Sequence, residues 1–237
     1  MRTKLKQIAD TGLQCFGLEI RSRSADHSLS FESYVHAASS RGLDVNDYLE
    51  DVEGWEPAAY VINEFVSPYR TDGSVVIEIG PGSGRHARYL LPRHERDELH
   101  LFDNSRWMQR FLRDYFRKYP TVTVHEFRQD YRLDFPAEQA DIVFSNGTFI
   151  ALKLGEIREF VLEAYRVLKP GGCFVFDYLD LSREQGWEYL QSRPTSLAGC
   201  YTYFMPETID KICFDAGFHL RRRDVHGKGV FVNFIKN

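Results

Sequence analysis

From Ser74 onward, short apolar runs of strand length alternate with segments of helical periodicity. The apolar runs predict buried strands over Val75–Ile79, Leu99–Phe102, Thr121–Phe127, Asp141–Ser145 and Cys173–Asp177. Helices are predicted between these strands, each ending at a proline or at the sequence KPGG, over Arg85–Leu91, Trp107–Tyr119 and Ile157–Leu168. Alternation of strands and helices with short connections is typical of crossover units, so we expect an α/β fold with a mostly parallel sheet.

The two ends of the chain depart from this rhythm. Phe218–Val225 and Val230–Ile235 are two strand-like runs separated by a short glycine-containing turn, which predicts a terminal antiparallel hairpin. The sequence before residue 68 instead contains short amphipathic segments, Leu43–Leu49 and Pro57–Val66, the second with proline at a helix start. We therefore predict a helical N-terminal arm or lid over residues 1–67 and a single α/β domain over residues 68–237.

Three glycines follow the first predicted strand in the sequence VIEIGPGSGRH. A P-loop is excluded because it needs a lysine after the glycines, and none occurs between Gly80 and Lys118. A dinucleotide-binding turn needs a third glycine where this chain has Arg85, so NAD is disfavoured. The pattern E-x-G-x-G-x-G places Glu78 before Gly80, where a carboxylate repels a pyrophosphate but attracts an ammonium group. S-adenosylmethionine carries an ammonium group and no phosphate, and is therefore favoured.

Polar side chains stand at the ends of the next three predicted strands. Asp103 ends the second strand, at a position that suits ribose hydroxyls in NAD as well as in S-adenosylmethionine. Asp130 follows the third strand, where an adenine amino group could donate to it, and Asn146 opens a polar turn after the fourth. Because ligands of open α/β sheets bind outside the carboxyl ends of the strands, we expect these residues to share one crevice.

Five segments in this order, VIEIGPGSGRH, LFDNS, FRQDY, ADIVFSNGTF and EAYRVLKPGGCFVFDY, resemble the motifs of class I S-adenosylmethionine-dependent methyltransferases. The resemblance runs from about Ser74 to the C-terminus, and Pro206 to Phe218 is similar to the family's helix before its terminal hairpin. It implies a Rossmann-like seven-stranded sheet, mostly parallel with an antiparallel last strand and helices on both faces. It also implies a methyltransferase whose cofactor is S-adenosylmethionine.

The resemblance further implies a role for each cofactor-binding candidate. Gly80, Gly82 and Gly84 would line the methionine part, Asp103 would bind the ribose, and Asp130 with Tyr131 would bind the adenine. The full set of cofactor-binding candidates is Glu78, Gly80, Gly82, Gly84, Asp103, Asn104, Asp130, Tyr131 and Asn146.

The acceptor of the methyl group is less clearly marked. The turn NGTFIAL lacks an N-P-P-Y-like run, which argues against enzymes that methylate amino groups of nucleic acids. No cluster with metal-ligand spacing accompanies the strand ends, so no metal is expected. Candidate catalytic residues come from the arm and from the loops above the sheet: His36, Asn146, Asp177 and Tyr201.

Composition changes this picture in a few respects. The net charge of −4 and the isoelectric point near 6.1 disfavour a nucleic-acid partner. The four cysteines form no C-x-x-C pair, which indicates reduced thiols and a cytoplasmic protein. No apolar run reaches the length of a membrane span, but the basic, amphipathic first residues fit either a packing helix or peripheral binding to the inner membrane.

The opening LKQIADTGLQCFGLEIRSRS resembles the leaders of bacterial methyltransferases of surface-polysaccharide assembly. This resemblance implies O-methylation of a hydroxyl or terminal group of a sugar or glycan. Two alternatives remain open, an enzyme that methylates a phenolic or other natural-product hydroxyl, and a non-catalytic module that binds S-adenosylmethionine. The sequence makes no prediction about the oligomeric state.

Overall fold

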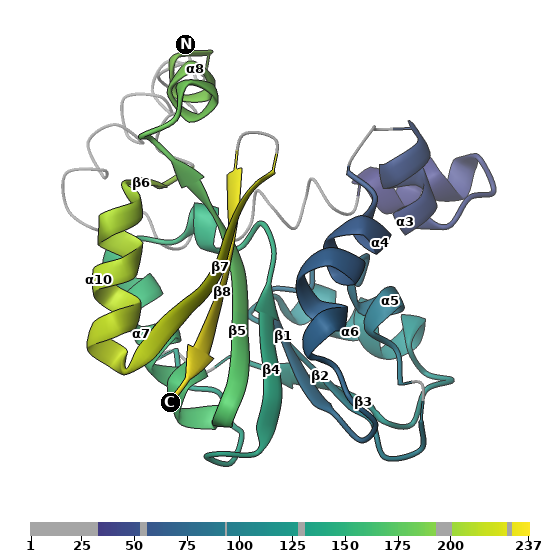
Figure 1. Ribbon diagram of the computed structural model, residues 1–237. Coiled ribbons are helices and arrows are strands. Elements are labelled where there is room, and N and C mark those ends of the chain that lie inside the picture. The colour runs from purple at the N-terminus through teal and green to yellow at the C-terminus, as the bar shows by residue number, and fades with distance from the viewer. Residues whose placement is uncertain (1–32, 53–55, 93, 128–130, 193–200, 227–228) are drawn as a thin grey trace, which may run out of the picture. The chain divides into compact units, whose positions relative to one another are not determined.

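The computed structural model describes residues 33–52, 56–92, 94–127, 131–192, 201–226 and 229–237 (Figure 1). The chain forms two compact units, Met1–Trp55 and Glu56–Asn237. The sequence suggested a boundary after residue 67, whereas residues 56–67 group here with the sheet.

The second unit is built on a sheet whose main path runs β3-β2-β1-β4-β5-β8-β7, with β6 paired to β5 (Figure 1). The strands are β1 (Val75–Ile79), β2 (Glu98–Asp103), β3 (Val122–Glu126), β4 (Ala140–Ser145), β5 (Leu168–Asp180), β6 (Tyr203–Phe204), β7 (Phe218–His226) and β8 (Gly229–Lys236). Strand β8 is antiparallel to both β5 and β7, and the other pairs are parallel. The predicted parallel sheet with a terminal hairpin is confirmed, and the two-residue β6 adds an eighth strand.

Each helix predicted in the second unit is present with shifted ends, and the structure adds further short helices. They are α4 (Ala58–Val61), η2 (Ile62–Val66), η3 (Ser67–Tyr69), α5 (Ala87–Leu90), α6 (Arg106–Tyr115), η4 (Phe149–Ala151), α7 (Leu154–Val167), α8 (Glu184–Ser192) and α10 (Pro206–Ala216). Helix α5 is shorter than predicted, because Gly84 adopts positive φ and Leu91 is extended before Pro92. Helix α8 is an addition that the sequence did not predict.

The sequence KPGG after α7 has a different role from the one predicted. Helix α7 ends at Val167, and β5 begins at the next residue and runs through KPGG. The pairing of β4 with β5 shifts register across this segment, from Ala140–Leu168 to Ile142–Cys173. The segment is therefore an irregularity within the strand rather than a loop before it.

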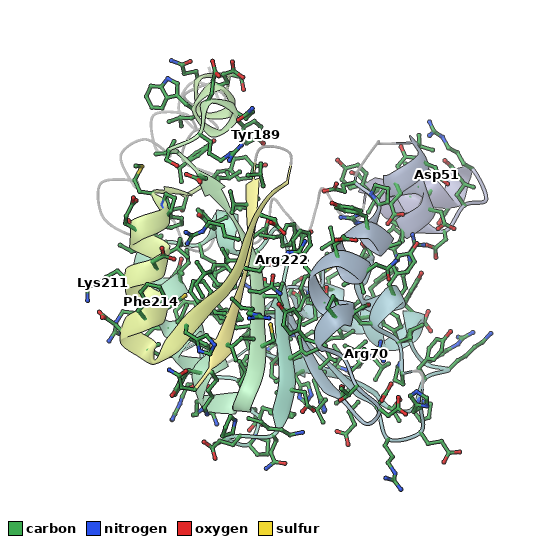
Figure 2. All side chains as sticks on the ribbon, in the orientation of Figure 1. Asp51, Arg70, Tyr189, Lys211, Phe214 and Arg222 are labelled. Atoms are coloured by element: carbon green, nitrogen blue, oxygen red, sulfur yellow. The ribbon has the colours of Figure 1, made fainter. Side chains whose placement is uncertain are left out.

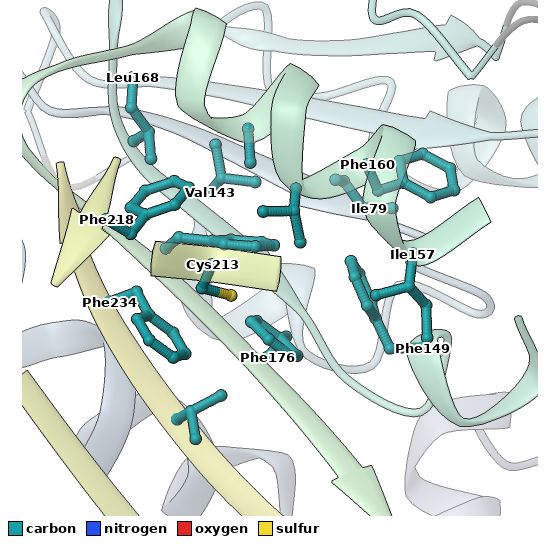
Figure 3. Packing of buried hydrophobic residues seen from close by; sticks show 14 of the residues in the cluster. Ile79, Val143, Phe149, Ile157, Phe160, Leu168, Phe176, Cys213, Phe218 and Phe234 are labelled. Atoms are coloured by element: carbon teal, nitrogen blue, oxygen red, sulfur yellow. The ribbon is translucent and has the colours of Figure 1, made fainter. Parts of the chain in front are cut away.

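The sheet is covered on both faces by apolar side chains, as expected from central strands such as β1 and β4, which are apolar along most of their length. On one face, residues of α7 and α10 pack on the sheet around Phe174, Phe176 and Phe234 (Figure 3). On the other face, residues of α4, η2, α5 and α6 pack on Val76, Phe144 and their neighbours. Within the described residues, no helix is long and apolar enough to cross a bilayer.

The segment before β1 is fastened to the α/β unit by several contacts. The ring of Phe65 stacks on Phe231 of β8 at 4.5 Å, and its carbonyl oxygen accepts from the buried amide of Asn233 at 2.8 Å. Closer to β1, the guanidinium of Arg70 (labelled in Figure 2) pairs with Asp97 at 2.9 Å, with both side chains almost fully buried. These contacts explain why the helical segment 57–66 belongs to the α/β unit.

In the first unit, the structure describes a helix over residues 33–40, then α3 (Val45–Asp47) and a π-helical turn, η1 (Tyr48–Val52). Asp44 caps α3, since its carboxylate accepts from the backbone N–H of Asn46 at 2.8 Å. Tyr48 is buried under Arg41, whose guanidinium lies 5.0 Å from the ring centroid.

Candidate functional site

The glycine turn after β1 leaves open space at one glycine of its three. Gly80, Gly82 and Gly84 all have positive φ, which disfavours any side chain at these positions. A Cβ atom on Gly80 would lie 2.1 Å from the hydroxyl oxygen of Thr148, and one on Gly84 would lie 2.7 Å from the ring of Phe116. Beside Gly82, in contrast, no atom of the described residues lies within 4 Å of such a Cβ. Gly80 and Gly84 thus serve packing, and Gly82 leaves room for a ligand to approach the backbone.

Glu78, on the strand that leads into this turn, is a buried carboxyl group with unused bonding capacity. Its exposed fraction is 1%, and its Oε2 atom has no hydrogen-bond partner among the described residues. Burial raises the pKa of Glu78 to about 8, while the positive charge of Arg85 opposes the rise and the carboxyl of Asp103 adds to it. A cationic group bound here would restore the negative charge of Glu78 and provide the missing partner.

Asp103 ends β2 next to the glycine turn, as the sequence predicted. Burial raises the pKa of Asp103 to about 6, against the lowering effect of backbone N–H groups of Ser105, Gly82 and Asn104. The Ser105 N–H donates to Asp103 Oδ1 at 2.7 Å. The carboxyl of Asp103 is therefore tied to the turn that contains Gly82, while Asn104 is exposed beside it.

The turn after β4 is hydrogen-bonded to the ends of both neighbouring strands. The hydroxyl of Ser145 donates to the carbonyl oxygen of Ile79 at 2.9 Å, at the end of β1. The N–H of Gly147 donates to Asp177 Oδ1 of β5 at 2.7 Å. Asn146 is half-buried between these two anchored residues. The structure thus brings Asn146 and Asp177, two of the catalytic candidates, to the same end of the sheet.

The adenine-binding candidates are only partly described. Asp130 lies outside the described residues. Tyr131 adopts positive φ, packs its ring against Phe160 and donates its hydroxyl to Glu156 of α7. Burial, followed by the interaction with Glu156, raises the pKa of Tyr131 to about 12. The Tyr131 hydroxyl is therefore held by α7, and its backbone or ring edge is what remains for a ligand.

Tyr201, a further catalytic candidate, belongs to a group of three tyrosines beyond the end of β5. The next residue, Thr202, donates its N–H to the carbonyl oxygen of Ile150 at 2.7 Å, which fastens this segment to the turn after β4. The rings of Tyr201 and Tyr203 lie 6.0 and 6.5 Å from that of Tyr189 on α8. Tyr189 is labelled in Figure 2. His36, the remaining candidate, is an exposed residue of the helix 33–40 in the first unit.

Two residues at the site were missed by the sequence analysis. Thr148 lies against Gly80, with its hydroxyl 3.3 Å from the carbonyl oxygens of both Ile79 and Gly80. Arg85, read only as a missing glycine, is buried near Glu78 and donates to the carbonyl oxygen of Glu56. The position of Thr148 in the turn after β4 was visible in the sequence, but nothing local indicated that it faces Gly80. Across the described part of the chain, no group of three His, Cys, Asp or Glu side chains is placed to hold a metal ion.

Comparison with known proteins agrees with this geometry. Residues 76–172 match the model of a family described as a methyltransferase domain. The fold is similar to a SAM-dependent methyltransferase from Aquifex aeolicus, with 20% identity, a TM-score of 0.62, and coverage of 81% of this chain and 93% of the other. No curated protein sequence matches the chain significantly.

Two further solved structures have the same fold. One is a SAM-dependent methyltransferase from Thermotoga maritima, described as a possible histamine N-methyltransferase, with 20% identity, a TM-score of 0.59 and coverage of 81% and 97%. The other is a chain of the Haloferax volcanii complex that contains the Trm112 methyltransferase activator, with 18% identity, a TM-score of 0.64 and coverage of 85% and 96%. Residues 76–172 thus match a methyltransferase domain, and the fold is the one found in S-adenosylmethionine-dependent methyltransferases. The domain indicates an enzyme whose cofactor is S-adenosylmethionine.

Proposed function

We propose that this methyltransferase transfers the methyl group to a hydroxyl of a sugar or glycan. Two neighbouring features support S-adenosylmethionine as the methyl donor. There is open space beside Gly82, and Oε2 of buried Glu78 has no hydrogen-bond partner among the described residues. The ammonium of S-adenosylmethionine would pair with Glu78, and its methionine part would lie along the backbone at Gly82. Asp103 and Asn104 would bind the ribose, and Asp130 with Tyr131 the adenine.

When bound, S-adenosylmethionine supplies an electrophilic methyl group, and the chain must align a hydroxyl with it and remove the hydroxyl proton. Asp177 is our candidate for the proton acceptor, because it is a half-buried carboxylate of β5 beside the end of β4 and it already contacts the turn after β4. Asn146 lies in that turn and would orient the acceptor hydroxyl. His36 is a second candidate base, on the first unit.

The acceptor side is proposed to be the group of Tyr189, Tyr201 and Tyr203. A tyrosine offers an apolar ring face and a hydroxyl at its edge, which suits a sugar ring with its mixture of C–H and O–H groups. These rings stand beyond β5, at the same end of the sheet as Asp177. Trp187, half-exposed on α8 (exposed fraction 50%), favours the alternative acceptor, a phenolic or other planar natural product.

Transfer of a labelled methyl group from S-adenosylmethionine tests the proposal. The protein is incubated with nucleotide sugars and glycan oligomers in one series, and with phenolic compounds in another. We expect transfer to the sugars, and loss of that transfer in Tyr201→Ala with cofactor binding unchanged. Transfer to phenolic compounds alone would contradict the proposal. Calorimetry with S-adenosylhomocysteine accompanies each variant, so that a loss of cofactor binding is not mistaken for a loss of acceptor binding.

A further inference from the structure

Helix α6 carries a row of exposed basic side chains that the cofactor site does not use. Arg106, Arg110 and Arg113 recur every three or four residues, so they lie along one side of the helix, and Arg117 and Lys118 follow in the turn after its end. With a rise of about 1.5 Å per residue, the helical part of the row, from Arg106 to Arg113, is about 10 Å long. The side chains of Arg106 and Arg117 are 82% and 69% exposed.

The charge of this face contrasts with that of the whole chain. Two carboxylates lie in the row: Asp114 is 3.2 Å from Arg117, and Glu126 is 4.0 Å from Arg106. Arg113 donates to the carbonyl oxygen of Val124 at 3.2 Å, so it is anchored but keeps its charge. Positive charges thus outnumber negative ones on this face, whereas the chain as a whole has a net charge of −4.

A cavity of about 360 Å³ lies at the far end of the row, lined by residues at and just beyond the C-terminal ends of α5 and α6. Its lining combines rings and cations, among them Arg88, Tyr115, Arg117, Lys118 and Tyr119. Tyr119 is 43% exposed. Both helices begin at the carboxyl ends of strands, next to the glycine turn and Asp103, so the row leads from the cofactor site to this cavity.

Three kinds of polyanion could meet such a face, and the structure favours one. A nucleic acid has one charge per phosphate along each strand, and proteins that bind it are usually basic overall, whereas this chain has an isoelectric point near 6.1. A membrane surface needs apolar side chains that protrude, and the exposed rings here line a concave cavity. A glycan with carboxylate groups has a lower charge density, and its sugar rings fit a cavity that contains tyrosines.

We propose that the α6 row and the cavity bind a linear anionic glycan. The carboxylates of the glycan pair with the arginines, and one of its sugar rings packs against Tyr119. This inference rests on the proposed function, and it specifies the acceptor as an anionic polysaccharide held along α6 with one end at the cofactor site. Binding away from the reacting group would hold a long acceptor in place without a deep pocket around the hydroxyl.

The test is binding of fluorescently labelled oligogalacturonate to the full chain, measured by anisotropy without methyl donor. The row is altered in Arg110→Glu/Lys118→Glu and the cavity in Tyr119→Ala. The matched control is Arg158→Glu/Lys211→Glu, which changes the charge equally at exposed residues of α7 and α10. We expect binding that weakens with added salt, that falls about tenfold or more in the row variant, and that the control variant retains. The carboxyl-reduced, neutral oligomer should bind more weakly than oligogalacturonate.

Four results would overturn the inference: no binding of oligogalacturonate at low salt, equal losses in the row and control variants, tighter binding of a single-stranded oligodeoxynucleotide, or tighter binding of phosphatidylglycerol-containing vesicles. The inference and the proposed function can fail separately. Methyl transfer to neutral sugars without oligogalacturonate binding would support the proposed function and refute the glycan-binding role of the α6 row. If oligogalacturonate binds and the row variant weakens this binding, but no sugar is methylated, the row is a glycan-binding surface and the proposed methyl transfer to a sugar is refuted.

Discussion

Thr148 fills the space that a side chain at Gly80 would need. Its hydroxyl lies 3.3 Å from the carbonyl oxygen of Gly80, and a Cβ atom on Gly80 would approach it to 2.1 Å. The glycine turn is therefore held from the side by the turn after β4, which is itself fixed by the hydrogen bond from Gly147 to Asp177. Asp177 on β5 thus helps to hold in place the backbone that the cofactor must approach.

The contact between Thr148 and Gly80 predicts a selective effect of Gly80→Ala. The new methyl group combines a clash with Thr148 and about 1–2 kcal/mol of strain from positive φ, so the turn must move. We expect S-adenosylhomocysteine binding to fall by about tenfold or more in calorimetry. Gly171→Ala is the matched control, because Gly171 also has positive φ but faces open space at the other end of β5. Equal losses of binding in both variants would show that strain alone, without the Thr148 contact, explains the effect.

Glu78 predicts an unusual dependence of stability on pH. Burial raises its pKa from 4.5 to about 8, so between these values the folded chain holds one proton more than the unfolded chain. The free energy of unfolding therefore falls as pH rises through this interval, by at most about 1.4 kcal/mol per pH unit, and levels off above the folded pKa. Glu78→Gln removes the titrating group and keeps the shape. In urea unfolding, we expect the variant to be more stable than the wild type at about pH 8 and similar to it at about pH 5.

The same substitution, Glu78→Gln, should weaken the binding of the cofactor. An ammonium group stabilises ionised Glu78, so wild-type affinity for S-adenosylhomocysteine should rise with pH as the carboxyl loses its proton. Glu78→Gln should bind more weakly and lose this dependence. Parallel pH profiles of stability and affinity in the two proteins would contradict the role given to Glu78.

Asp177 has two proposed roles that substitutions can separate. Asp177→Asn keeps an oxygen to accept from the Gly147 N–H but removes the base, whereas Asp177→Ala removes both. We expect Asp177→Asn to retain S-adenosylhomocysteine binding and to lose about a hundredfold or more in methyl transfer. Asp177→Ala should lose binding as well, because the turn after β4 is released. If Asp177→Asn transfers methyl groups at the wild-type rate, Asp177 positions the turn and the base lies elsewhere.

The sequence was sufficient to predict all strands but the two-residue β6, because the central ones, such as β1 and β4, are short apolar runs that both faces of the sheet bury. It was also sufficient to place Glu78 and Asp103 at one edge, since parallel strands end on the same side. It did not predict helix α8, whose sequence EQGWEYLQS contains glycine and leaves Trp187 half-exposed, so that its amphipathic pattern is weak. The different duties of Gly80, Gly82 and Gly84 were equally out of reach, because they depend on Thr148 and Phe116, which approach from distant parts of the chain.

A histidine pair on β2 and β3, with His100 buried and His125 half-buried, predicts a pH effect of the opposite sign to that of Glu78. His100 Nδ1 lies 3.0 Å from His125 Nε2, and the ring of His125 stacks on Phe102. Burial, and then the neighbouring His100, lower the pKa of His125 from 6.5 to about 4. Between these values the unfolded chain holds the extra proton, so stability is lost as pH falls.

His125→Gln tests this effect, because glutamine can still hydrogen-bond to His100 but does not titrate. The substitution is best made in the Glu78→Gln background, where the opposing contribution of Glu78 is absent. At about pH 7.5, we expect the free energy of unfolding to fall modestly from the lost stacking on Phe102. On acidification to about pH 5, it should then fall less than in the parent with His125. Urea unfolding at both pH values measures the difference, and an equal fall in the two proteins would mean that His125 takes up a proton without unfolding.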